Sequence, residues 1–261
     1  MLELAELTFR EAARFARDRR SVVLLPLGAI EQHGPHLPLL VDWLGAEELA
    51  RRIAPHLSRA GYRPILAPAV PYGVSTLAVH WGGTVSLSIW TLTRVIVEIV
   101  AALAHHGFRN FVLVNYQADP DHLSAMAAAH RALRRRRAIR VAFAGFVPGA
   151  KMPSAMLNDT VLALMRSRRP EREWHSGELE TSLMLARRPR LVRRTVMRRL
   201  RPVWVDFGAG LRRGARRFEQ LDPRRRGYFG SPALARAATG DKVMALRGRL
   251  IAREVIATLK R

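Results

Sequence analysis

Short apolar runs that alternate with helical patterns constrain the fold of this chain more than any other feature. The run "SVVLLPLGA" (21–29) is rich in branched residues and is ended by Pro and Gly, which is typical of a buried strand. Three similar runs follow at 63–73, 110–115 and 139–146. This alternation predicts an α/β fold, with a mostly parallel central sheet covered by helices on both faces.

Helical spacing of apolar residues predicts the elements between these runs. We expect helices at 1–20, 43–61, 91–107, 121–137, 177–188 and 241–261. The segment 189–230 is rich in arginine and proline and has no clear period, so we interpret it as a long, loop-rich excursion. A chain of 261 residues is long enough for one large α/β domain, and we expect a single domain over 1–261.

Composition limits the location and the partners of the protein. The absence of cysteine excludes disulfides, thiolate zinc sites and cysteine nucleophiles. The sequence has neither an apolar run of membrane-spanning length nor a secretory signal, which favours a cytoplasmic protein without a membrane partner. The net charge of +23 comes almost wholly from arginines that follow no known nucleic-acid-binding motif. We therefore expect nucleic acid to bind only non-specifically.

The stretch "LPLGAIEQHGPHLPLLVDWLG" (25–45) places ionisable residues in an otherwise apolar segment, directly after the first predicted strand. Glu31 and His33 point the same way if the segment is extended, and Asp42 arrives just before a helix. Carboxylates and imidazoles together bind Zn, Mn or Fe. The alternatives are a polar loop with a satisfied histidine and, for Asp42, a helix N-cap.

Two later segments occupy comparable positions. "NYQADPDH" (115–122) follows the third predicted strand, and "EWHSGELE" (173–180) opens a helix. Ligands in parallel sheets gather at the carboxyl ends of the strands. We therefore expect the three segments to converge on one metal site.

Several of these motifs resemble those of the creatininase (creatinine amidohydrolase) family. The matching stretches are "LPLGAIEQHGPHLPLLVD" (25–42), "PYGVSTLAVHWGGTVSL" (71–87), "HSGELETSLML" (175–185) and "GYFGSPALARAATGDK" (227–242). The resemblance implies a three-layer α/β/α sandwich, often assembled as a homo-oligomer, a hexamer. It also implies a hydrolase that uses divalent metals to cleave amide bonds, frequently cyclic or formyl amides.

The resemblance implies a role for each candidate site residue. Glu31 corresponds to a ligand of one metal, His33 to a ligand of the other, and Asp42 to the carboxylate that bridges them. A hydroxide held between two such cations would attack the amide, and His175 would pass the proton to the leaving nitrogen. The cofactor would be Zn, Mn or Fe, with one or two ions per chain.

Glu178 and Glu180 lie next to this histidine in the sequence. Either could orient His175 or complete the set of metal ligands. For Glu178, a carboxylate favoured by the start of a helix is an equally good interpretation.

The sequence departs from the family pattern after the third strand. The family has V-N-G-H where this chain has "VNYQADP", so Gln117 stands in place of a histidine ligand and Asp119 in place of the second ligand. Tyr116 replaces a glycine, so the backbone differs there or a ring lines the pocket. A glutamine is a weak ligand for zinc. A two-metal site with altered preference, a one-metal site and a degraded site all remain open.

Other side chains have expected positions near the substrate. Trp174 is either a wall for a flat ligand or a core residue, and His80 either lines the substrate pocket or is a buried histidine. We expect His36 to hold a ligand carboxylate. His122 is expected to be exposed at the start of a helix, with recruitment to the site by a displaced loop as the alternative.

These observations favour a metal-dependent amidohydrolase that acts on the C–N bond of a small, non-peptide amide, either a cyclic amide or a formamide. The first alternative is a metallopeptidase that trims a peptide during maturation of a modified peptide cofactor. The second is a non-catalytic homologue with a degraded metal site. No G-x-S-x-G, G-x-x-x-x-G-K-[ST] or G-x-G-x-x-G motif points to another chemistry.

Overall fold

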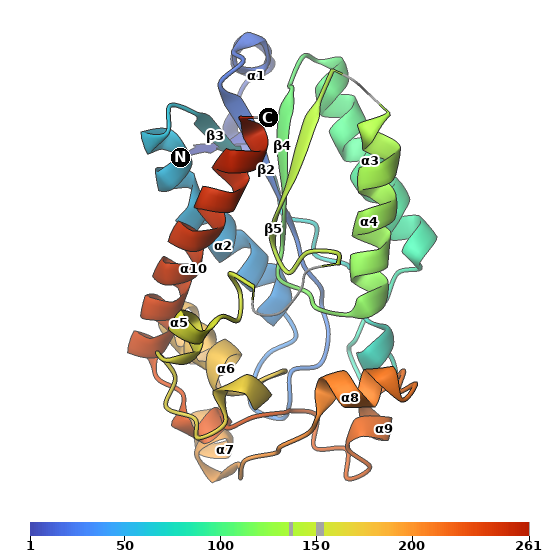
Figure 1. Ribbon diagram of the computed structural model, residues 1–261, viewed down its shortest axis with the longest axis vertical. Coiled ribbons are helices and arrows are strands. Elements are labelled where there is room, and N and C mark those ends of the chain that lie inside the picture. The colour runs from blue at the N-terminus through green and yellow to red at the C-terminus, as the bar shows by residue number, and fades with distance from the viewer. Residues whose placement is uncertain (136–137, 150–153, 261) are drawn as a thin grey trace.

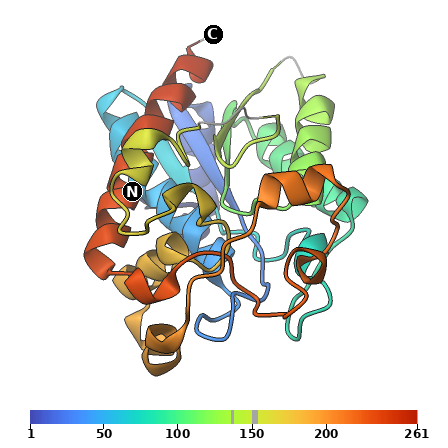
Figure 2. The same ribbon diagram turned by 60° about the horizontal axis from the view of Figure 1, so that its bottom comes forward.

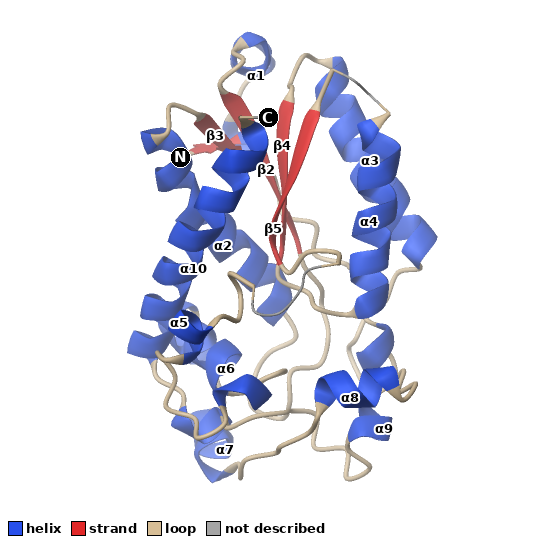
Figure 3. Cartoon of the chain, in the orientation of Figure 1, coloured by secondary structure: helices blue, strands red, loops and turns tan. Residues whose placement is uncertain are grey.

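The computed structural model describes residues 1–135, 138–149 and 154–260. Its strands form a five-stranded, all-parallel sheet in the order β1-β3-β2-β4-β5. The strands are β1 (Leu2–Glu3), β2 (Ser21–Leu27), β3 (Arg63–Leu66), β4 (Asn110–Asn115) and β5 (Arg140–Gly145). Helices flank this sheet in Figure 3. The predicted α/β class is therefore confirmed.

The longer helices are α1 (Phe9–Arg17), α2 (Val41–Arg59), α3 (Ile89–His105), α4 (Pro120–Arg134), α6 (Glu178–Arg187) and α10 (Ala237–Leu259). Figure 1 shows α6 beyond the carboxyl ends of the strands, where it packs on α10. The short helices are α5 (Asp159–Leu162), α7 (Arg194–Arg199), α8 (Phe207–Arg212) and α9 (Phe218–Leu221). In Figure 1, α2 and α10 cover one face and α3 and α4 cover the other, which confirms the three-layer arrangement.

Burial on both faces explains the continuous apolar runs of the strands. Val22 and Leu24 of β2 pack into the core beneath α2 and α10, whereas Val23 and Leu25 pack into the core beneath α3 and α4. Successive side chains of a strand point to opposite faces, so every position of a central strand must be apolar here. The central strands β2 and β4 show this pattern most clearly.

The order of the strands creates a topological switch point between β2 and β4. The chain leaves β2 toward β3 on one side, whereas β4 pairs with the other side of β2. Loops that follow two such strands diverge and leave a crevice that commonly holds ligands. Gly28 lets the first loop turn close to α2, since an added Cβ would lie 2.4 Å from the Trp43 Cα. The sequence motifs of both strands therefore open onto the same crevice.

Some elements differ from the sequence-based expectations. The predicted opening helix is shorter, because β1 precedes α1 and pairs with β3 at the sheet edge. A two-residue strand is too short to show a period in the sequence. The segment 189–230 contains α7, α8 and α9, and Figure 2 shows these helices across the end of the molecule that faces the viewer.

Two predicted ends fall outside the described residues, namely Arg136 and Arg137 of the basic run and Arg261 at the end of the chain. Among the residues that the structure describes, no helix is both long and apolar enough to cross a lipid bilayer.

Candidate metal centre

His33 is held by its backbone neighbourhood so that one ring nitrogen faces a cluster of carboxylates. Its Nδ1 lies 3.1 Å from the Glu31 carbonyl oxygen and donates to it. The other nitrogen, Nε2, is buried without a hydrogen-bond partner and lies 3.6 Å from both Asp42 Oδ1 and Glu180 Oε2. A metal-ligating histidine usually donates its second N–H to a carbonyl in this way. The ring is therefore oriented as a ligand would be.

Asp42 and Glu180 come from the first turns of two helices, α2 and α6. The N-cap of α2 is Leu40, so the N-cap interpretation of Asp42 is wrong. Asp42 Oδ2 is buried and unpartnered. Burial raises the pKa of Asp42 well above its usual range and that of Glu180 to about 7. Two desolvated carboxylates beside an imidazole nitrogen form a site that a cation would stabilise.

Glu31 lies on the other side of His33 and is buried. Its carboxylate accepts a hydrogen bond from the side-chain amide of Gln117, and its Oε1 lies 3.9 Å from His175 Nδ1. Burial and the nearby charge of Asp42 raise the pKa of Glu31 to about 8. Two groups of three possible metal ligands therefore share His33. One is Glu31, His33 and His175, and the other is His33, Asp42 and Glu180; within each group the ligand atoms lie within 4.8 Å of one another.

The side chains present fit a divalent cation. Two buried polar atoms in the cluster, His33 Nε2 and Asp42 Oδ2, have no partner in the described protein. Unpaired buried polar groups are costly, and native proteins retain them mainly where a ligand or ion satisfies them. Imidazole nitrogen and carboxylate oxygen are the donors that Zn and Mn share.

His175 is fixed at the edge of this cluster by the turn that precedes α6. It forms an isolated antiparallel bridge with Phe229, and Ser176 adopts a left-handed conformation with φ of 54°. His175 Nε2 lies 3.0 Å from both the Gln32 carbonyl oxygen and the Gln32 side-chain nitrogen, and a proton on Nε2 would satisfy the carbonyl and leave the lone pair on Nδ1. Burial and the neighbouring His33 hold the pKa of His175 well below its usual range. The ring is therefore neutral and can accept a proton at Nδ1.

Glu173 is a carboxylate that the sequence did not single out, and it supports this turn. It is buried and accepts hydrogen bonds from the backbone N–H groups of Glu178 and Ser231. Glu178 follows His175 by three residues, and Ser231 lies two residues after Phe229, the bridge partner of His175. By holding both backbone segments, the carboxylate of Glu173 positions the histidine.

Glu178 faces away from the cluster. Its carboxylate accepts hydrogen bonds from the backbone N–H groups of Arg166 and Ser167, at 2.7–3.0 Å. Glu178 therefore stabilises the backbone at Arg166 and Ser167. Glu180 is the carboxylate of α6 that lies near the His33 imidazole.

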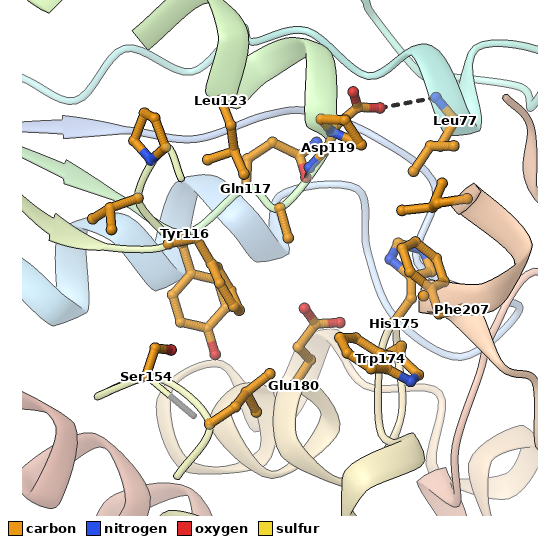
Figure 4. Close-up of a pocket in the computed structure, with 18 of the residues that line it drawn as sticks. Leu77, Tyr116, Gln117, Asp119, Leu123, Ser154, Trp174, His175, Glu180 and Phe207 are labelled. Carbon is orange, nitrogen blue, oxygen red and sulfur yellow. Dashed lines mark hydrogen bonds between the residues drawn. The ribbon is translucent and has the colours of Figure 1, made fainter. Parts of the chain in front are cut away.

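Asp119 and Gln117 use their polar atoms within the loop after β4. Asp119 is the N-cap of α4 and accepts from Asp121 N and Leu77 N, each at 2.9 Å, as the dashed line to Leu77 in Figure 4 shows. Gln117 donates from Nε2 to Glu31 and Ser75, while its Oε1 accepts from Asp119 N. Asp119 belongs to neither trio of possible ligand atoms, although its charge acts on Asp42 and Glu31.

Two histidines near the site differ from the expectations. His36 contacts Thr181 Oγ1 at 2.8 Å, so the prediction that it holds a ligand carboxylate is wrong. His80 has 44% of its side chain exposed and lies 3.9 Å from Glu219, so it is not a buried histidine. It is also absent from the wall of the cavity beside the cluster.

His122 is fully buried, so the prediction of an exposed side chain is wrong. Its Nδ1 accepts from Val74 N at 3.3 Å, because the loop that carries the second motif (71–87) folds over the start of α4. Burial lowers the pKa of His122 to about 3.

His122 should make the protein sensitive to acid. A folded pKa below the unfolded value of 6.5 means that its contribution is complete above pH 6.5 and is lost as the pH falls toward 3. We expect a loss of ~1.4 kcal/mol per pH unit in this window. Urea unfolding of His122→Asn should show a smaller loss than wild type, whereas His105→Asn, at an exposed histidine, should match wild type. Equal slopes for wild type and His122→Asn would contradict the prediction.

A cavity of about 570 Å³ opens beside the cluster. Glu31, His175 and Glu180 form its polar end, and Trp174, which stacks on Phe207 at 5.5 Å between ring centroids, forms part of its apolar wall. Figure 4 shows the Glu180 carboxylate between the rings of Tyr116 and Trp174. The predicted pocket positions of Tyr116 and Trp174 thus agree with the lining of this cavity.

Comparison with known proteins agrees with this geometry. The family model for creatininase, described as creatinine amidohydrolase, matches residues 5–255. The chain belongs to the creatininase family. It is 31% identical over 204 residues to a creatinine amidohydrolase of Pseudomonas putida, covering 72% of this chain and 73% of that protein. It is also 31% identical over 230 residues to a mycofactocin precursor peptide peptidase of Mycobacterium tuberculosis, covering 85% and 80%.

Solved creatininases share the fold along the whole chain. A mutant creatininase of Zn–Zn type superposes with a TM-score of 0.75 at 27% identity, covering 99% of this chain and 98% of that chain. A manganese creatininase superposes with a TM-score of 0.74 at 26% identity, covering 100% and 99%. The fold and the membership in this hydrolase family are thus established together.

Proposed function

We propose that this creatininase-family protein is a metal-dependent amidohydrolase that cleaves a C–N bond of a small cyclic amide or a formamide. The observation that carries the proposal is the unpartnered His33 Nε2, which faces the carboxylates of Asp42 and Glu180 inside a buried cluster. The neighbouring structures of zinc and manganese creatininases favour Zn or Mn as the cofactor.

His33, Asp42 and Glu180 would hold the cation, and Glu31, which groups with His33 and His175, lies on the other side of His33. A divalent cation supplies charge that polarises an amide carbonyl and lowers the pKa of water. Gln117 keeps the Glu31 carboxylate turned toward the cluster by donating to it. At least one metal ion per chain is therefore expected, and the altered loop after β4 favours one ion over two.

The protein itself would move the proton. His175 Nδ1 faces the cluster and is available to accept the proton of the attacking water and to return it to the leaving nitrogen. The stacked rings of Trp174 and Phe207 form an apolar part of the wall of the same cavity. This arrangement supports general acid–base catalysis beside an electrophilic centre.

A second candidate is the trimming of a peptide, and one observation favours it. The cavity of about 570 Å³ is in the range of sites for ligands much larger than a single small ring. The relative named as a mycofactocin precursor peptide peptidase covers more of this chain than the creatinine amidohydrolase does. Both candidates require the same cluster and differ only in what fills the cavity.

Chelation should abolish hydrolysis if the proposal is right. The purified protein would be analysed for metals and then assayed with lactams, formamides and short peptides before and after metal removal. We expect at least one Zn, Mn or Fe per chain, and loss of cleavage on chelation with recovery on adding Zn or Mn. Native protein that carries no metal, or cleavage that survives complete removal, would refute the proposal.

The proposed assembly rests on the family resemblance, and the proposed location rests on the sequence features described above. We expect a homo-oligomer, a hexamer, in the cytoplasm. Exposed apolar side chains near the start of α3, including Trp90, Val85 and Ile89, support contact with another chain. Light scattering of the purified protein tests the assembly, and a monomer would contradict it.

A further inference from the structure

A buried arginine lies in the same cavity as the metal cluster. Arg247 is 1% exposed, although it belongs to α10, an outer helix of the three-layer fold. It is four residues from both Val243 and Ile251, which are core residues of that helix. A cation in this position requires partners that replace water, because a buried charge without them is very costly.

The partners of Arg247 in the protein are neutral oxygens. Its Nε and Nη2 donate to the Met156 carbonyl oxygen at 2.9 and 2.6 Å, and its Nη1 donates to the Tyr116 hydroxyl at 3.0 Å. Among the described residues, no salt bridge joins the guanidinium to a carboxylate, and the charge of Arg247 acts on Glu180 only from beyond hydrogen-bond distance. A guanidinium has five N–H groups, so these contacts leave donors for a further acceptor.

The Tyr116 hydroxyl is a second donor at the same place. It accepts the hydrogen bond from Arg247, and its own proton has no acceptor among the described residues. The bond from the arginine polarises the hydroxyl and makes it a stronger donor. The Tyr116 ring packs against Gly45 of α2. A larger residue at position 45 would not fit, since its Cβ would lie 2.5 Å from the ring.

The cavity connects these donors to the reaction site. Arg247, Tyr116 and Ser154 line it together with Glu31, Glu180 and His175. Figure 4 shows the Tyr116 hydroxyl directed toward Ser154, on the opposite side of the Glu180 carboxylate from Trp174. The remaining wall is largely apolar and includes Leu123, Leu157, Leu179, Phe207 and Leu211. A ligand in this cavity would thus meet a metal site, two polar donors and an apolar surface.

We propose that Arg247 and Tyr116 bind a carboxylate of the substrate, and that the substrate is therefore an amide that carries a free carboxylate and an apolar group. This inference rests on the proposed function, since it names the substrate class of the same site. Arginine–carboxylate hydrogen bonds are charge-assisted and stronger than neutral ones. The substrate's carboxylate supplies a directly bonded charge partner, which Arg247 lacks among the described residues, and its apolar group covers the leucines and Phe207.

The same chemistry occurs in acylated or formylated amino acids and at the carboxyl terminus of peptides. All three place a carboxylate a few bonds from an amide. The proposal therefore excludes neutral lactams as the preferred substrates, whereas it accommodates both a formamide and a peptide.

A matched pair of probes tests this in the wild-type enzyme. We would compare hydrolysis of N-formyl-L-leucine with that of N-formyl-L-leucinamide, and of Ala-Leu with Ala-leucinamide, in metal-loaded protein. We expect kcat/KM to be at least about tenfold higher for the acid of the preferred pair, with the difference mainly in KM. Equal values for acid and amide would overturn the inference and leave the proposed amidohydrolase function intact.

Binding without turnover separates the two proposals further. Calorimetric titration of the His175→Ala protein with N-acetyl-L-leucine and N-acetyl-L-leucinamide should show binding of the acid at least about tenfold tighter. Selective binding of the acid by this variant, with no hydrolysis of any probe by the metal-loaded wild type, would support the inference while refuting the proposed function. Equal binding of both ligands would overturn the inference even if hydrolysis occurs.

Two variants distinguish carboxylate binding from a purely structural role. In Arg247→Met, the preference for acid over amide should fall to about one, and Arg247→Lys should restore part of it. If Arg247 only supports the Met156 loop, both probes should lose activity together and the preference should remain. Tyr116→Phe removes a single hydroxyl and replaces Arg247→Met in the test if that variant does not fold. It should lower the preference for acid over amide severalfold. An unchanged preference in folded Tyr116→Phe and Arg247→Lys would overturn the proposal.

Discussion

Replacing Asp42 with alanine is expected to leave the purified protein without bound metal. Asp42 lies 3.6 Å from His33 Nε2, and its second oxygen is buried without a partner. Loss of a supporting contact around a metal ligand typically weakens binding 10- to 100-fold, so loss of the ligand itself should exceed about 100-fold. Elemental analysis of protein purified in parallel with wild type measures this directly.

The Asp42→Ala protein should still fold, which separates loss of metal from loss of structure. Burial raises the pKa of Asp42 well above its usual range. In the metal-free wild type, this residue therefore lowers the free energy of unfolding, and the loss grows as the pH rises from about 4. The alanine variant avoids that loss. Its thermal stability without metal should therefore equal or exceed that of chelated wild type at neutral pH.

Asp119 provides a matched control, because it is also a buried aspartate and lies in the loop after β4 that lines the cavity. Its two oxygens accept from Asp121 N and Leu77 N, so Asp119→Ala should lose about 1 kcal/mol of stability as a missing helix cap. The variant should retain its metal. Loss of metal from Asp119→Ala, or retention in Asp42→Ala, would reverse the assignment of ligands made from the contacts.

The sheet and its order of elements could be predicted because strands buried on both faces leave a strong pattern. The prediction for β4 (110–115) has the observed boundaries, since both faces of this central strand are covered. The strand β1 could not be predicted, because two residues carry no period and its pairing with β3 depends on the fold. The helices within 189–230 are too short for periodicity to indicate them.

The convergence of the site residues was predictable from topology, but the detailed contacts were not. Glu31, His33 and Asp42 follow β2, and the crevice beside β4 brings them near the loop of Gln117. The capping role of Asp119 depends on Leu77, which is 42 residues away in the sequence. Distant backbone donors of this kind leave no mark on the local sequence.

Arg247 is different, since a signal for it existed. It lies at the i+4 position between Val243 and Ile251 on the apolar stripe of α10. A cation on the buried face of an amphipathic helix is unusual, because charged residues are almost never fully buried unless they are paired. Helical spacing alone would thus have marked Arg247 as a candidate functional residue. Its contact with Tyr116 could be found only from the folded structure.

Replacing His175 with alanine should leave the metal in place and abolish hydrolysis. His175 Nδ1 faces Glu31 Oε1 at 3.9 Å, and its other nitrogen is held by the Gln32 carbonyl oxygen. A neutral ring fixed in this orientation can take a proton in one step and return it in the next. Removal of such a group typically lowers kcat about 10²- to 10⁴-fold. The metal content should stay at the wild-type level because His33, Asp42 and Glu180 remain.

His80→Ala is the matched control for this loss, since His80 is an exposed histidine outside the cavity wall and should keep wild-type turnover. Measuring metal and kcat for both variants decides between two roles of His175. Its ring also belongs to a trio of ligand atoms with Glu31 and His33. If His175→Ala loses the metal together with activity, the histidine is a ligand and another group must move the proton. If turnover is unchanged, the ring has neither role, and its fixed tautomer only supports the turn before α6.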